Sequence, residues 1–160
     1  MVSLADRQLR LVRWDELRCG SGGSAGAVED DLRTLLFVDG DAAAAAYGRL
    51  ENPAVSQGHL FECAPAVVSV IVAAITDGTV PPSNVASALD LLGRILAGYP
   101  DESEVAQGRE DLSHRCHHEA LRGYWALLRV ACGRDAFNAW RVAVDVLSML
   151  DDEHSTTFVQ

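Results

Sequence analysis

The chain's densest group of possible metal ligands lies in one short segment. That segment contains His114, Cys116, His117, His118 and Glu119. His59 and Cys63 stand four residues apart and would share one face of a helix. A zinc site needs two such pairs to converge tetrahedrally, and neither pair has the spacing of a known zinc finger. A polar helix start that carries incidental histidines explains the segment better, and a metal site remains the alternative.

Signatures of nucleophilic or nucleotide chemistry are weak. Cys116 and His117 are neighbours, and adjacent helical residues point about 100° apart, so the thiol and the imidazole would not meet. The segment GSGGSA at 20–25 contains G-x-G-x-x-A, but a dinucleotide fingerprint must follow a strand. The preceding residues have a helical pattern. We therefore expect a linker there, and we expect no enzyme, no cofactor and no bound metal.

Composition restricts the class of partner. The 160 residues carry 23 acids and 13 basic residues, for a net charge of −10, which argues against direct nucleic-acid binding. The most apolar stretch, 64–75, is shorter than the roughly 20 residues that span a bilayer. The first residues do not resemble a signal peptide, and four widely spaced cysteines indicate reduced thiols. We expect a cytoplasmic protein in which Cys63 and Cys132 are buried.

Helical spacing of apolar residues dominates the chain and predicts seven helices. Their expected ranges are 5–18, 28–38, 42–51, 64–76, 83–97, 113–132 and 136–150. The β-branched run 67–72 could form a strand, but Pro65 and the Ala73–Ala74 pair favour a central helix. No convincing partner strand is present. Asp41 and Asp135 have the chemistry of helix caps.

The helices divide into a repeating pattern of an apolar helix, a short turn and a second apolar helix. It recurs at 35–50, 72–96 and 127–147, close to the period of about 40–47 residues in HEAT and armadillo repeats. We expect one domain over 1–150, with an N-terminal helix and a Gly-rich linker in 1–27 and three helix pairs in 28–150. The tail 151–160 should fray. The predicted fold is all-α, a short right-handed α-solenoid.

Two segments, 56–75 and 115–147, resemble the HEAT-like helical-repeat proteins of actinobacteria. In that family a His-Gln-Gly element precedes an aromatic residue and a long apolar helix. Gln57, Gly58 and Phe61 fit this pattern, and Ser56 stands where the histidine would be. The resemblance implies a helical-repeat fold, a protein-binding habit like that of small immunity or antitoxin proteins, and no shared catalytic set.

The excess acids are concentrated in two blocks, within 28–63 and 101–119. Their default interpretation is a solvated surface, and the alternative is an electrostatic surface for a basic partner. The residues expected at such a surface are Asp39, Asp41, Tyr47, Glu51, His59, Glu62, Asp101, Glu102 and Glu104. Trp125 and Trp140 lie on apolar faces and should be buried, whereas the sequence pattern does not decide whether Trp14 is buried or exposed.

The sequence therefore predicts a non-catalytic protein-binding module, an immunity or antitoxin protein that occludes the active site of a basic toxin. A metal-dependent enzyme or sensor that uses His59, Cys63 and the 114–119 cluster is one alternative. A structural adaptor within a larger complex is another.

Overall fold

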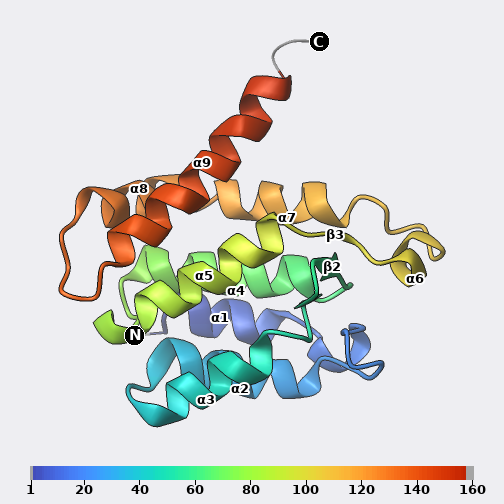
Figure 1. The fold of residues 1–160 in the computed structure, drawn as a ribbon. Coiled ribbons are helices and arrows are strands. Elements are labelled where there is room, and N and C mark those ends of the chain that lie inside the picture. The colour runs from blue at the N-terminus through green and yellow to red at the C-terminus, as the bar shows by residue number, and fades with distance from the viewer. Residues whose placement is uncertain (1, 158–160) are drawn as a thin grey trace.

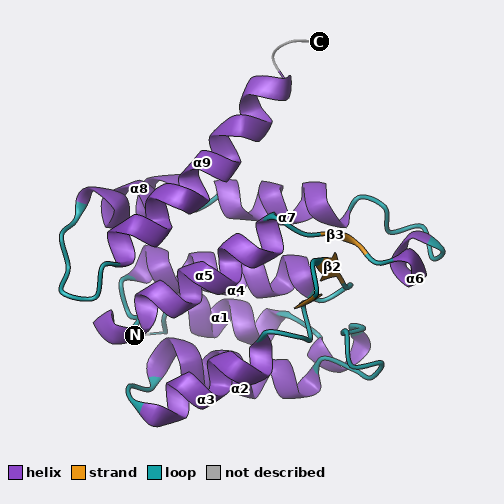
Figure 2. Cartoon of the chain, viewed as in Figure 1, coloured by secondary structure: helices purple, strands orange, loops and turns teal. Residues whose placement is uncertain are grey.

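The chain is mostly helical, as predicted (Figures 1 and 2). The computed structural model describes residues 2–157, with side chains up to residue 152. Its α-helices are α1 Leu4–Leu11, α2 Gly26–Phe37, α3 Asp41–Leu50, α4 Ala64–Asp77, α5 Val85–Leu96, α6 Glu102–Val105, α7 Leu112–Leu121, α8 Tyr124–Cys132 and α9 Ala139–Thr157. Two 3-10 turns and three short strands complete it: η1 Trp14–Glu16, η2 Pro82–Asn84, β1 Val55–Ser56, β2 His59–Leu60 and β3 Tyr99–Pro100.

The helices form two layers around a shared core. In one layer α4 lies between α1 and α7 and packs against both (Figure 1). In the other layer α5 packs against α3 and α9, and α4 also contacts α5. Neighbouring helices pair as α2 with α3, α4 with α5, and α8 with α9. The middle helices, α4 and α5, contribute more of the fully buried aliphatic side chains than any other pair of described helices.

Helix α4 is the central element, and its prediction as a helix is confirmed. Its buried residues occur on most sides, as expected of a helix surrounded by others. Pro65 stands in the first turn, where its missing N–H costs no hydrogen bond. Gly78, with φ of 68°, ends the helix and donates its N–H back to the last turn.

The predicted helix 113–132 is wrong as a single element. The chain bends at Arg122 and Gly123, which separates α7 from α8. A side chain at Gly123 would place its Cβ 2.3 Å from Cγ1 of Val72, so glycine lets this turn lie directly on α4. The bend changes which face of α8 is buried. Trp125, predicted to be buried, is 79% exposed, and Ala126 and Leu127 are buried instead.

The N-terminal region also differs from the predicted helix 5–18. Helix α1 ends at Leu11, and Trp14 in the following 3-10 turn is buried, with its indole N–H donating to the Leu9 carbonyl at 3.0 Å. The Gly-rich loop is tied to the body, since the Gly20 N–H donates to the Pro53 carbonyl. Cys63 is buried as predicted, whereas Cys132 is exposed and was predicted wrongly.

A small sheet that the sequence did not predict positions the acidic segment after α5. Strand β1 pairs antiparallel with β2, and β2 pairs parallel with β3. Its strands have two residues each, too short for an alternating pattern to stand out. Because β3 leads into α6, this pairing fixes where the acidic segment starts.

The C-terminal helix begins and ends later than the predicted 136–150. The Asp135 carboxylate accepts from the N–H groups of Phe137 and Ala139, so its predicted capping role is confirmed although α9 begins at Ala139. The helix continues to Thr157, into the predicted tail, and residues 158–160 lie outside the described part. Among the described residues, no helix has the length and apolar character needed to cross a membrane.

Candidate functional site

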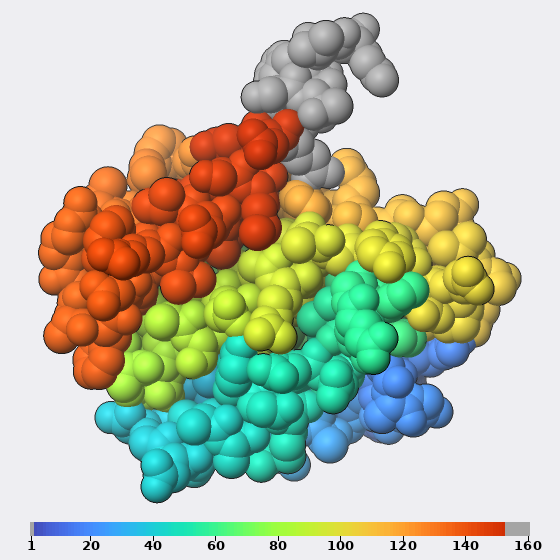
Figure 3. Space-filling view, viewed as in Figure 1, coloured from blue at the N-terminus to red at the C-terminus, as the bar shows by residue number. Residues whose placement is uncertain are grey.

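Residues 99–111 form a compact acidic region at one edge of the molecule, which we name the acidic corner (Figure 3). Its start is held by the sheet, because the Tyr99 N–H donates to the Gly58 carbonyl and the Asp101 N–H donates to the Leu60 carbonyl. The Asp101 carboxylate then caps α6 by accepting from the Ser103 N–H at 2.9 Å. Its end is held by Leu112, which is fully buried.

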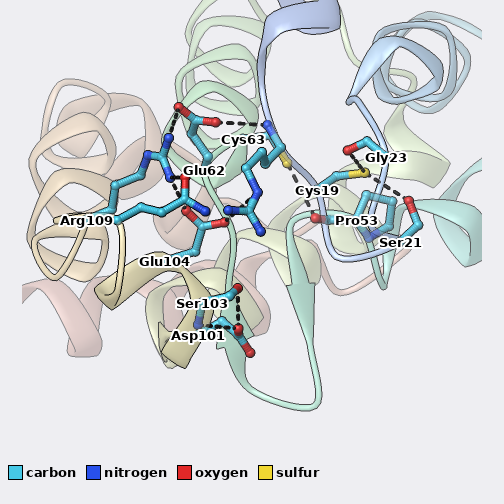
Figure 4. A network of polar contacts seen from close by, with 12 residues as sticks. Cys19, Ser21, Gly23, Pro53, Glu62, Cys63, Asp101, Ser103, Glu104 and Arg109 are labelled. Carbon is cyan, nitrogen blue, oxygen red and sulfur yellow. Dashed lines mark hydrogen bonds and ion pairs between the residues drawn. The ribbon is translucent and has the colours of Figure 1, made fainter.

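Glu104 anchors the corner from inside, which corrects its predicted place on an open surface. The side chain is 0% exposed. Its Oε2 accepts from Nη1 of Arg109 at 2.9 Å, and its Oε1 lies 3.7 Å from Nε of Arg18 without a hydrogen bond among the described residues (Figure 4). A carboxylate buried this deeply requires a paired cation. Glu104 is therefore part of the frame and unavailable to a partner.

Glu62 extends this network to two further segments. Its Oε1 accepts from Nη2 of Arg109 at 3.1 Å, and its Oε2 accepts from the backbone N–H of Arg18 at 3.0 Å (Figure 4). Arg109 thus bridges the carboxylate of Glu62, just before α4, and the carboxylate of Glu104 in α6. The network joins the N-terminal loop, the start of α4 and the acidic corner in one place.

Three carboxylates on the outward side of the corner are not paired with arginine in the described structure. Glu102, Glu110 and Asp111 are exposed and have no ion pair among the residues that the structure describes. Beside them, Tyr99 is 55% exposed and Val105 is 47% exposed. The surface therefore combines unpaired carboxylates with two apolar contacts, which is the chemistry of a protein-binding surface.

His59 lies between two groups of the corner. Its Nδ1 is 3.4 Å from the Asp101 carboxylate, and its Nε2 is 3.2 Å from the Tyr99 hydroxyl. Hydrogen bonds from the hydroxyl and N–H of Ser103 hold the pKa of Asp101 below its ordinary value. Asp101 is therefore charged at neutral pH, and its carboxylate lies close to the imidazole without a hydrogen bond to Nδ1 among the described residues.

The other predicted partner residues lie elsewhere, around α3 (Figure 1). Asp39 and Asp41 are exposed at the turn between α2 and α3. Tyr47 donates to the Asp90 carboxylate, and burial together with that hydrogen bond raises the pKa of Tyr47 to about 12. Glu51 lies 3.8 Å from Arg94. The structure thus divides the predicted set between two separate surfaces.

The residues considered as metal ligands in the alternative interpretation do not come together in the described structure. His59 belongs to strand β2 and Cys63 precedes α4, so they share no helix face. Cys116 is buried, whereas His114 and His118 are exposed. No group of three or more His, Cys, Asp or Glu residues within 2–152 has an arrangement that could hold a metal ion.

The buried thiols of Cys63 and Cys116 are poor nucleophiles. Burial raises the pKa of Cys63 well above its usual range, and it raises the pKa of Cys116 to about 12. The thiolate is the reactive form, so neither side chain is suited to attack a substrate at neutral pH.

The internal arginine network was missed at the level of sequence. Arg109 stands in an acidic block that was interpreted as solvent-facing, and Arg18 lies far from it in the sequence, near the N-terminus. The only available signal was a lone arginine among acids, with no periodicity to show that Glu104 points inward.

Comparison of the chain with protein-family models, curated proteins and solved structures gives no match.

Proposed function

We propose that this protein is a non-catalytic binding module of the immunity or antitoxin kind, which docks a basic toxin domain on the acidic corner and covers its active site. One observation carries the proposal. Glu102, Glu110 and Asp111 are exposed and form no ion pair with any described residue, on the same segment as the exposed Tyr99. The Arg109–Glu62 ion pair and the backbone hydrogen bonds of the small sheet fix this segment to the body.

A fixed acidic surface suits rapid and tight binding. Unpaired carboxylates attract a basic partner from a distance and raise the association rate. The sheet and the Glu104–Arg109 pair already order the segment, so little conformational entropy is lost when the partner docks. Tyr99 and Val105 then supply the apolar contacts that slow dissociation.

The wider architecture is part of the same proposal. We take the contacting pairs α2 with α3, α4 with α5, and α8 with α9 as three turns of a short right-handed solenoid. Stacked helix pairs leave extended surfaces that recognise other proteins. A cytoplasmic location agrees with four cysteines that form no disulfide.

The test is to recover the partner and then alter the corner. The tagged protein is used to capture binders from its source cell, and each captured protein is assayed for toxicity with and without this chain. We expect a basic protein that the chain neutralises. In the variant Glu102→Lys, Glu110→Lys, Asp111→Lys, the association rate should fall about tenfold at low salt, with a small change in dissociation.

A matched control reverses three acids outside the corner. Asp15, Asp30 and Asp145 are also exposed and lack ion pairs among the described side chains. Their lysine variant should associate at nearly the wild-type rate. A partner that binds the corner variant as fast as wild type would overturn the docking site. A stable complex that inhibits nothing would assign the chain to the adaptor class instead.

A further inference from the structure

A groove runs along α4 between α1 and α7, and the described residues that line it are all outside the acidic corner. It consists of two adjoining hollows of about 550 and 370 Å³ that share Gln8, Ser69 and Glu119. Pro65, Ala66, Ser69, Val72, Ala73 and Thr76 of α4 form its floor. One wall is α1 and the other is the outer face of α7, since both helices pack on α4 (Figure 1). We name it the arginine groove.

The walls of this groove carry cations that the protein itself does not neutralise. Arg7 on α1 and Arg115 on α7 are exposed, and neither forms an ion pair with any described residue. Eight of the thirteen arginines do form such pairs, and Arg7 and Arg115 are among the five for which the described residues show none. His114 and His118, one helical turn apart, line the same wall as Arg115.

Acidic side chains are nearly absent from the lining. Glu119 is the one carboxylate among the residues that line either hollow, and it lies 3.2 Å from Nη1 of Arg122. The groove is therefore positive on a chain whose net charge is −10. A local charge opposite to the net charge favours a small anionic surface over an extended polyanion, which the remaining acids would repel.

The groove also offers apolar surface. Leu4 and Leu11 on α1 are 53% and 64% exposed and line the hollow next to Arg7. Most of the α4 floor consists of alanine, valine and proline side chains. The polar groups on the floor are already satisfied, because Gln8 donates to Ser69 and Ser69 donates to the Ala66 carbonyl.

We propose that the arginine groove docks a helical segment of another protein, with carboxylates and aliphatic side chains on the face that enters the groove. Carboxylates would pair with Arg7 and Arg115, and aliphatic side chains would cover Leu4 and Leu11. Amphipathic helices bind in this way in grooves between helices. The 14-residue α4 sets the length, because a helix of that size extends about 21 Å.

An unbiased peptide selection tests the chemistry of the occupant. The full chain is immobilised and presented with a displayed library of 14-residue helical peptides, in which Leu, Ala, Glu, Gln and Lys vary freely. We expect the enriched peptides to carry Glu and Leu at i, i+3, i+4 and i+7 spacing. Binding of the best peptide is then measured by fluorescence anisotropy, together with versions in which Glu is replaced by Gln or Lys.

Two matched double variants locate the binding site. In Arg7→Glu, Arg115→Glu, affinity for the selected acidic peptide should fall by about tenfold or more, since two attractive contacts become repulsive. Arg134 and Arg141 also lack ion pairs in the described chain and lie over the ring of Trp140. Arg134→Glu, Arg141→Glu makes the same charge change outside the groove and should keep the affinity within about twofold.

Four results would overturn the proposal. They are no enrichment on the wild-type chain, enrichment of basic or neutral peptides, equal loss of affinity in both double variants, and competition by single-stranded DNA as effective as that of the peptide. The oligomeric state supplies a fifth check by analytical ultracentrifugation. A wild-type oligomer that Arg7→Glu, Arg115→Glu dissociates would give the groove to a second copy of this chain.

Discussion

The acidic corner and the arginine groove use the same two residue types in opposite ways. In the corner, Arg109 turns inward to the buried Glu104, and the exposed carboxylates of the corner have no ion pair within the described part of the chain. In the groove, Glu119 is held by Arg122 and the remaining arginines face solvent. The net charge of −10 describes neither surface. The sign of each surface depends on which charged side chains the fold pairs and which it leaves exposed.

The two regions also differ in how they are built. Side chains and backbone from three distant segments meet at the corner, and a buried charge holds them together. The groove needs no such network, because its shape follows from α1 and α7 packing on either side of α4. We therefore expect that breaking an ion pair disrupts the structure of the corner. A change in helix packing should instead alter the shape of the groove.

The largest expected effect comes from breaking the ion pair of the corner. Arg109→Met leaves Glu104 buried without its close cation, which should lower the free energy of unfolding by about 3–5 kcal/mol at neutral pH. Urea denaturation measures the loss. Hydrogen exchange should show faster opening of residues 101–111 than of α4.

The control for this variant is an exposed ion pair at the groove. Arg122→Met removes the partner of Glu119 and should cost less than about 1 kcal/mol. The double variant Arg109→Met, Glu104→Met should recover much of the lost stability, since the fully buried carboxylate of Glu104 is no longer left without its cation. Equal losses in Arg109→Met and Arg122→Met would show that the corner does not depend on its buried pair.

The next effect, in the floor of the groove, tests helix packing. Gly123→Ala places a methyl group 2.3 Å from Cγ1 of Val72 and should cost about 1–3 kcal/mol through overpacking. Adding Val72→Ala to this variant should recover part of that loss. Affinity for a groove-selected peptide should fall, while the corner keeps its hydrogen-exchange protection.

Gly48 provides the matched control for Gly123. It lies in α3, is exposed and has open space where a Cβ would stand. Gly48→Ala should stabilise the protein by about 0.5–1 kcal/mol, because alanine loses less backbone entropy in a helix. Destabilisation of the same size in both variants would contradict the close approach of Gly123 to α4.

A smaller effect concerns the protonation of the corner. Ser103→Ala removes the strongest cause of the lowered pKa of Asp101, so that pKa should rise toward its ordinary value. A carboxyl group with a lowered folded-state pKa contributes stability that is complete above its unfolded value of about 3.9 and is lost as pH falls through the folded value. The variant should therefore lose less stability on acidification below pH ~4.

Carbon NMR of the Asp101 carboxyl, followed from neutral to acidic pH, measures this shift directly. Denaturation at two acidic pH values gives the linked change in stability. Asp135 also has a lowered pKa, set by backbone N–H groups at the start of α9, and it should titrate identically in wild type and Ser103→Ala. A parallel shift of both carboxyl groups would indicate a general effect and remove the role of Ser103.

The sequence was sufficient for elements whose signal is local. Apolar periodicity and end signals predicted 64–76 and 83–97, and the structure has α4 at Ala64–Asp77 and α5 at Val85–Leu96. The break at Gly123 was missed because its cause is Val72, a residue about fifty positions away on another helix. Periodicity records which residues are apolar, and it does not record how closely two backbones approach.

The surfaces were harder to predict for the same reason. Glu102 and Glu104 are two residues apart in one acidic block, and only the fold separates an exposed carboxylate from a buried one. Arg7 and Arg115 are far apart in the sequence, and the fold places them on the walls of two adjoining hollows over α4. Charge blocks in sequence therefore located the acidic corner approximately and gave no sign of the arginine groove.

The smallest expected effect tests the helix break beside the groove. Trp125 follows Arg122 by three residues and is 79% exposed, so Trp125→Ala should change the free energy of unfolding by less than about 0.5 kcal/mol. Trp14→Ala, at a buried tryptophan that donates to the Leu9 carbonyl, should cost about 3–5 kcal/mol. Urea denaturation separates the two. A single continuous helix over 113–132 would bury Trp125 and make the two losses similar, which would also remove the bend that lets α7 and α8 lie against α4.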